Sequence, residues 1–251
     1  MRGLHWFRND LRLQDNRALD DLFQAVDEWC GLFVLEHRLV NKPSVSRKRL
    51  SFLFECLDDL ATDITQVGNR LVIIEGPAET QIPQLMHEMS ASVLSFNEST
   101  TPFAKSRDQS VICSVEKAGH RVLKRRDHVI FSATDIRSSK GSAYSVYTPY
   151  RNAWWKKHAQ SDHGNVTPSK QPGPIASLES ISSTKLFVKL KKSLEKPTFK
   201  SGCQAAHNRL NYFLNKPVAH YHQNRDRPDL DGTSRLSMHL RFGTISVREC
   251  F

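Results

Sequence analysis

The sequence predicts an α/β fold, a doubly wound parallel sheet of five strands, followed by the first helices of an all-α domain. Five short, nearly continuous apolar runs alternate with helix-like segments over the first half of the 251 residues. Such runs are typical of strands buried on both faces of a parallel sheet. Near the C-terminus the apolar residues recur instead at three- and four-residue spacing, which is typical of helices. We therefore expect an α/β domain over 1–131, a connection over 132–200 and an incomplete helical domain over 201–251.

Strands and helices are expected to alternate along the α/β part. The predicted strands are 3–7, 30–35, 70–76, 92–96 and 120–123. The clearest helix covers 50–64, where apolar residues form one face and Ser46 is placed to cap the first turn. Shorter helical patterns follow Pro77 and Pro102. This order predicts right-handed crossover connections between parallel strands.

Composition excludes several classes of protein. The hydrophobic fraction of 39% and the charged fraction of 25% are ordinary for a soluble globular protein. No apolar run approaches the roughly 18 residues of a membrane span, and the N-terminus lacks the apolar core of a signal peptide. The five cysteines form no C-x-x-C pair, which argues against a disulfide framework and a zinc site. We expect a soluble intracellular protein with no membrane partner, in a compartment that composition leaves open.

The positive charge is unevenly distributed. Residues 1–100 carry 10 Lys and Arg against 15 Asp and Glu, whereas 101–200 carry 19 against 7. A basic second part favours an anionic partner, nucleic acid first. The alternative is that the Lys-rich stretch 185–200 is a solvated linker without a partner. The Ser, Pro and Gly content of 162–184 likewise predicts a linker or a long surface crossing.

A charged segment follows the first predicted strand. Arg8, Asp10, Arg12 and Asp15 lie where open α/β sheets place functional loops. The same alternating charges also suit a local web of ion pairs, with Asp15 or Asn16 capping the next helix. Because charge networks are often structural, the web is the favoured interpretation.

Aromatic and basic residues alternate over 147–157 (YTPYRNAWWKK). Such a segment can stack nucleic-acid bases and contact phosphates. It can equally pack the joint between two domains, which we favour.

Hydroxyl side chains and an arginine gather over 231–237 (DGTSRLS). At a helix start, free N–H groups and hydroxyl donors suit a phosphate or pyrophosphate, and Arg235 adds a cation that can bind in a bidentate manner. The alternative is an ordinary Ser/Thr helix cap. No G-x-G-x-x-G or Walker-type phosphate loop follows any predicted strand.

Taken together, these segments resemble one family, the DNA photolyases and cryptochromes. Residues 4–16 (LHWFRNDLRLQDN) are similar to its N-terminal signature, 147–150 (YTPY) to its V-[FY]-T-P-[FY] segment, and 232–237 (GTSRLS) to its flavin-binding block. The resemblance implies an α/β antenna domain, a connection, and the opening helices of the domain that binds FAD.

The resemblance also implies site residues and an activity. The FAD pyrophosphate would lie on Thr233, Ser234, Arg235, Leu236 and Ser237, with Tyr221 also touching the flavin and Arg225 contacting the DNA backbone. The activity would be light-dependent repair of cyclobutane pyrimidine dimers in damaged DNA by electron transfer from reduced FAD. That reaction requires no acid–base catalytic residue and no metal. An antenna chromophore would lie near the loop 97–103, where the sequence does not decide between a folate, a deazaflavin and no second chromophore.

The chain resembles a family member truncated at its C-terminus, because the later flavin-domain helices have no counterpart. An apolar face would then be exposed unless a partner covers it: Leu210, Phe213, Leu214, Leu240 and Phe242. Two alternatives to a repair enzyme therefore stand, a cryptochrome-type blue-light photoreceptor and an inactive fragment or binding module without light chemistry.

Overall fold

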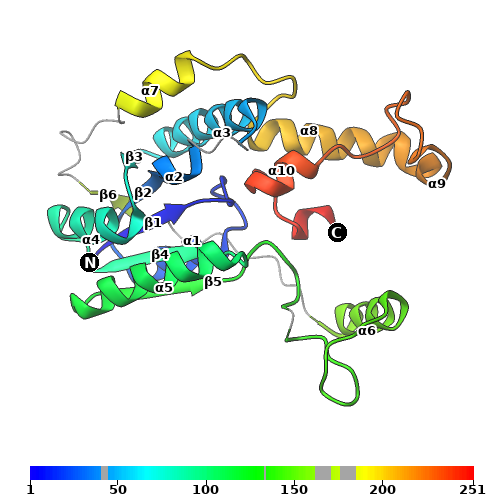
Figure 1. Ribbon diagram of the computed structural model, residues 1–251, viewed down its shortest axis with the longest axis horizontal. Helices are drawn as coiled ribbons and strands as arrows, with labels where there is room; N and C mark the ends of the chain where they lie inside the picture. The colour runs from blue at the N-terminus through cyan, green and yellow to red at the C-terminus, as the bar shows by residue number, and fades with distance from the viewer. Residues whose placement is uncertain (41–44, 133, 162–170, 176–184) are drawn as a thin grey trace.

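A parallel sheet forms the centre of the computed structural model, which describes residues 1–40, 45–132, 134–161, 171–175 and 185–251. The strand order is β3-β2-β1-β4-β5 (Figure 1). The strands are β1 Arg2–Phe7, β2 Glu28–Leu35, β3 Leu71–Glu75, β4 Val93–Asn97 and β5 Arg121–Arg125. The predicted doubly wound, five-stranded parallel sheet is thereby confirmed. A short β6, Gly173–Pro174, adds to the start of β2 and was not predicted.

Helices cover both faces of the sheet. They are α1 Arg17–Ala25, α2 His37–Val40, α3 Arg47–Gln66, α4 Ala78–Glu88 and α5 Pro102–Lys117. One apolar core lies between the sheet and α1 and α3, and a second lies between the sheet and α4 and α5. Asn16 caps α1 by accepting a hydrogen bond from the Leu19 amide at 3.3 Å, as predicted. Ser46 holds the N-cap position of α3 but makes no capping bond with its side chain.

The second half of the chain is helical. Its elements are α6 Tyr147–Gln160, α7 Lys185–Lys192, α8 Gly202–Asn215, a 3-10 turn Pro217–His220, α9 Tyr221–Asn224, α10 Ser237–Phe242 and a second 3-10 turn Arg248–Cys250. Helix α6 stands apart from the sheet, and α8 and α10 lie on the side of α3 (Figure 1). Within the described residues, no helix combines the length and the apolar character needed to cross a bilayer.

The aromatic segment of α6 packs less than a joint would. No residue of α6 is buried, and Trp155 is 49% exposed. Trp154 makes ring contacts with Phe131 and Phe251, at 5.4 and 5.3 Å between centroids. Helix α6 therefore joins distant segments of the chain through this aromatic cluster, without a buried interface.

The Lys-rich stretch contains a packed helix. Phe187 of α7 is buried, and its ring lies 5.0 Å from that of Phe54 on α3. Leu186 and Leu190 pack against the same core. The solvated-linker interpretation is therefore wrong for α7, because apolar residues at helical spacing bury one face while the lysines remain outside.

The expected apolar face is only partly exposed. Leu214 and Leu240 are 53% and 40% exposed. Leu210 and Phe242 are buried, the latter with its ring 5.6 Å from that of Phe52 on α3. The expectation fails for Phe242 because α10 folds back onto the α/β part, and for Leu210 because Leu236 and Ile245 pack against it.

The segment after α10 is bound to the loop that follows β1. The Phe242 carbonyl accepts a hydrogen bond from the Leu11 amide at 3.0 Å, and Arg12 donates to the Gly243 carbonyl at 3.1 Å. Arg248 then pairs with Asp15 at 2.8 Å and with Asp127 at 2.6 Å. Arg12 pairs with Asp127 as well, which makes a buried cluster of four charges.

A destabilising carboxyl lies beside this cluster. Asp20 of α1 is 9% exposed, and its Oδ2 has no hydrogen-bond partner within the described chain. Burial, together with the negative charges of Asp15, Asp21 and Asp127, raises the pKa of Asp20 to about 6. The unfolded chain therefore ionises this group first, so stability falls as pH rises from about 4 to about 6 and stays lower above that.

We expect Asp20→Asn to raise the free energy of unfolding by about 1–2 kcal/mol at pH 7.5 and to change it little at pH 4. Urea denaturation of both proteins at the two pH values measures this difference. An equal effect at both pH values would contradict the assigned cause.

Candidate functional site

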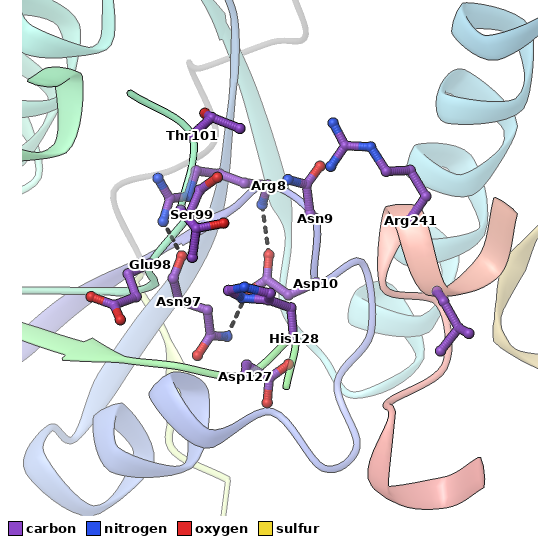
Figure 2. A pocket seen from close by; sticks show the side chains of 12 residues that line it. Arg8, Asn9, Asp10, Asn97, Glu98, Ser99, Thr101, Asp127, His128 and Arg241 are labelled. Atoms are coloured by element: carbon purple, nitrogen blue, oxygen red, sulfur yellow. Dashed lines mark hydrogen bonds between the residues drawn. The ribbon is translucent and has the colours of Figure 1, made fainter. Parts of the chain in front are cut away.

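Three strand-end loops converge where the strand order reverses, between β1 and β4 (Figure 2). They enclose a hollow of about 250 Å³ lined by 8–10, 97–101 and 127–128. Leu240 and Arg241 of α10 close it from the other side. In open α/β sheets this switch point is the usual place for a ligand.

A buried carboxylate forms the floor of this hollow. Asp10 is 3% exposed and accepts hydrogen bonds from the Arg8 amide and from Asn97 Nδ2, both at 2.7 Å (Figure 2). Burial alone would raise the pKa of Asp10, but nearby His5 and these donors outweigh it and lower the pKa to about 2. The group is therefore a charged, fully bonded anchor for the loops.

The arginine beside it is also paired within the protein, although its Nε has no hydrogen-bond partner in the described part of the chain. Arg8 pairs with Asp108 at 2.5 Å and donates to the Asn97 carbonyl. Its guanidinium lies 4.6 Å from the Trp6 ring centroid and 4.8 Å from that of Phe96. The structural interpretation of these charges is confirmed, but the web is not local: Arg8 and Arg12 pair with Asp108 and Asp127, and Asp15 pairs with Arg248.

A second, larger hollow lies on the other side of α10. Its volume is about 670 Å³, within the usual range for small-molecule sites. Arg209 and Tyr212 of α8 line one wall, and Thr233, Arg235 and Ser237 line another. Helix α10 therefore borders both hollows.

The backbone of 232–237 changes hand at Arg235. Arg235 has a left-handed φ of 51°, and Leu236 follows in the right-handed region at φ −83° and ψ −1°. Alternation of this kind turns successive N–H groups toward one point and forms an anion-binding concavity. In this fully described segment, no amide from Gly232 to Leu236 donates to a protein acceptor, and no hydroxyl of Thr233, Ser234 or Ser237 is hydrogen-bonded.

The capping interpretation of this segment is wrong. Helix α10 begins at Ser237, with Leu236 at the N-cap and no side-chain capping bond. The left-handed Arg235 interrupts any helix before that position, so Thr233 and Ser234 precede the helix instead of capping it.

Comparison with known proteins places the chain in a family. The family model for DNA photolyase matches residues 3–173. The chain belongs to the DNA photolyase family.

Two photolyases and one shorter protein illustrate its relatives. A deoxyribodipyrimidine photo-lyase of Synechococcus sp. is 31% identical over 99% of this chain and 52% of its own length. An uncharacterized 31.6 kDa protein of Synechococcus sp. strain PCC 6716 is 27% identical over 98% of this chain and 86% of its own length. The crystal structure of the Sulfolobus tokodaii photolyase, described with two FAD molecules, superimposes with a TM-score of 0.78 at 26% identity, over all of this chain and 54% of that one. This chain thus spans about half the length of these photolyases.

The residues that resemble the photolyase flavin block are only partly brought together. Thr233, Arg235 and Ser237 line the larger hollow. Ser234 turns its carbonyl toward Arg209, and Leu236 is buried in a small apolar cluster with Leu210.

The other two predicted residues lie outside the lining of this hollow. Tyr221 is 43% exposed, with its ring 5.9 Å from that of Phe213. Arg225 is exposed and pairs with Asp226 at 3.4 Å. Their roles toward flavin and DNA stay predictions.

Sequence reasoning missed Arg209 and Tyr212. They are three positions apart on α8, on the side that faces the flavin block. A cation and an aromatic at i and i+3 are the one sequence signal that could have identified them, and it is weak by itself.

Proposed function

We propose that this photolyase-family chain binds FAD by its pyrophosphate and serves light-dependent repair of cyclobutane pyrimidine dimers in DNA. The observation that supports it most is the concavity of 232–237, where unpaired amide and hydroxyl donors surround a left-handed Arg235. These donors match the chemistry of a pyrophosphate, which is dense in anionic acceptor oxygens.

The chemical groups that line the larger hollow suit FAD. Thr233 and Ser237 would donate hydroxyl hydrogen bonds, and Arg235 would bind phosphate oxygens with its guanidinium. Tyr212 and Phe199, which line the same hollow, offer aromatic surface to a ring of the cofactor. Bound and reduced FAD supplies an electron when it absorbs light.

Damaged DNA would be held from outside this hollow. Arg225 is exposed on the same part of the chain and would contact a backbone phosphate, which positions the duplex without reading its sequence. The lesion would have to leave the base stack to approach the flavin, which costs less for a base that already pairs poorly.

Binding of FAD can be measured directly by flavin fluorescence during titration of the purified chain. We expect FAD to bind, and Arg235→Ala to weaken it by roughly tenfold or more, because a charge-assisted hydrogen bond contributes about 1.5–3 kcal/mol. Riboflavin, which lacks the pyrophosphate, should be insensitive to this substitution. Absence of FAD binding by the unchanged chain would contradict the proposal, and bound FAD would lead to a repair assay on dimer-containing DNA.

No antenna chromophore is assigned to the switch-point hollow. Its volume of about 250 Å³ is below the 300–1,000 Å³ usual for small-molecule sites. Arg8 already pairs with Asp108 there, and Asp10 already accepts hydrogen bonds from the Arg8 amide and from Asn97. These residues do not fit a folate or a deazaflavin in the conformation observed.

A further inference from the structure

One arginine of α8 makes most of the contacts that hold the flavin block. Arg209 Nε donates to the Ser234 carbonyl at 2.8 Å, and Nη2 donates to the Thr233 carbonyl at 2.6 Å. Its guanidinium also grips both carboxylate oxygens of Asp231, at 2.7 and 2.5 Å. The Arg209 Cζ atom also lies 4.8 Å from the Tyr212 ring centroid, so the aromatic ring helps to hold the guanidinium in place.

These contacts determine which way the peptide groups face. In a trans peptide the carbonyl and the following amide point in opposite directions. Because Arg209 draws the carbonyls of Thr233 and Ser234 toward α8, the amides of Ser234 and Arg235 point away from α8. Those amides are among the donors that lack a protein acceptor.

The same arginine holds a strained residue through its partner. Asp231 forms an ion pair with Arg235, whose Nε lies 2.9 Å from its carboxylate, while Arg209 binds the same carboxylate. A left-handed conformation at a non-glycine residue costs about 1–2 kcal/mol and persists only where surrounding contacts enforce it. Arg209 supplies such contacts on the N-terminal side of Arg235, through the carbonyls of Thr233 and Ser234 and through Asp231.

We infer that Arg209 is a positioning residue of the anion site: its guanidinium, bound to Asp231 and to two backbone carbonyls, holds 231–235 so that the amide donors converge. The inference rests on the proposed function, since the anion is the FAD pyrophosphate. It assigns to α8 a role in affinity for the phosphate part of the ligand alone.

Three variants test this role. Arg209→Gln removes the charge and the fork, and Arg209→Lys keeps the charge but cannot form the planar set of contacts. Lys216→Gln is the matched control, because its ammonium lies over the same Tyr212 ring at 5.9 Å and makes no contact with 231–235. Each variant is titrated with FAD and with riboflavin, and each is digested with trypsin in the absence of ligand.

We expect Arg209→Gln to weaken FAD at least tenfold and riboflavin less than twofold, with Arg209→Lys nearly as impaired and Lys216→Gln unchanged. Trypsin should cleave after Arg235 at least fivefold faster in Arg209→Gln than in Lys216→Gln. Equal FAD affinity in Arg209→Gln and the unchanged chain would overturn the inference, as would an equal loss of FAD and riboflavin. If the unchanged chain binds no FAD, the proposed function fails, and the cleavage rate after Arg235 still decides whether Arg209 orders the segment.

Discussion

Gly243→Ala is expected to lower the free energy of unfolding by roughly 2–5 kcal/mol, the sum of left-handed strain and overpacking. Gly243 ends α10 with φ 67°, and a Cβ there would lie 2.1 Å from the Asn9 carbonyl oxygen and 2.5 Å from the Asp10 Cα. Backbone atoms of the loop after β1 cannot yield as a flexible side chain can. The substitution should therefore separate α10 from that loop as well as strain the turn, and denaturation in urea measures the loss.

Gly68→Ala separates the two causes. Gly68 has a similar φ of 77°, but a Cβ there would meet nothing within 4 Å. Gly68→Ala should lower the free energy of unfolding only by the cost of the left-handed conformation, about 1–2 kcal/mol. Equal losses in the two variants would show that the close approach of α10 to the sheet domain contributes nothing.

Arg248→Ala is expected to destabilise the protein by about 3–5 kcal/mol, because it removes the cation that pairs with both largely buried carboxylates, Asp15 and Asp127. The Arg248 side chain is 10% exposed, and those of Asp15 and Asp127 are 19% and 6% exposed. Arg12 would still pair with Asp127, but it bonds only the backbone carbonyl of Asp15, so the Asp15 carboxylate would lose its ion pair with Arg248. Thermal and urea unfolding should both detect the change.

An exposed ion pair provides the comparison. Arg125 pairs with Asp21, but its side chain is 57% exposed. Arg125→Ala should change the free energy of unfolding by no more than about 1 kcal/mol, since water already screens that pair. A loss from Arg248→Ala no larger than this would mean that the four-charge cluster does not hold the C-terminal segment in place.

The sheet was predictable because its strands carry their own signal. Each predicted strand matches an observed one within two residues at either end, as for 30–35 and Glu28–Leu35. Burial on both faces demands a continuous apolar run, and such a run is visible without knowledge of the neighbours. The division of the chain at 131 and 200 stays a prediction.

Helices α6 and α7 were missed for different reasons. Helix α6 buries no residue, so no apolar periodicity marks it. In α7 the lysines dominate the composition and conceal the apolar face that contains Phe187. In both segments, local composition suggested the wrong environment: a packed joint for α6 and a solvated linker for α7.

The cluster of hydroxyl side chains and an arginine at 232–237 was predictable, but the contacts that hold its backbone were not. The hydroxyl and arginine cluster was visible at 232–237, whereas the clamp by Arg209 depends on two backbone carbonyls. Carbonyl groups are the same at every position of a chain, so no residue pattern reveals which of them an arginine will bind. The docking of Gly243 on Asn9 was hidden for the same reason.

The contact between Arg12 and Gly243 joins residues 231 positions apart, which affects the order of events during synthesis. A ribosome adds about 5–20 residues per second, so the loop after β1 waits on the order of 10 to 50 seconds for its last partners. Throughout that interval the sheet can assemble, while the Leu11 amide and part of the charged cluster remain in contact with water. The loop after β1 is therefore synthesised early but completes its contacts late, once Phe242 and Gly243 have been made.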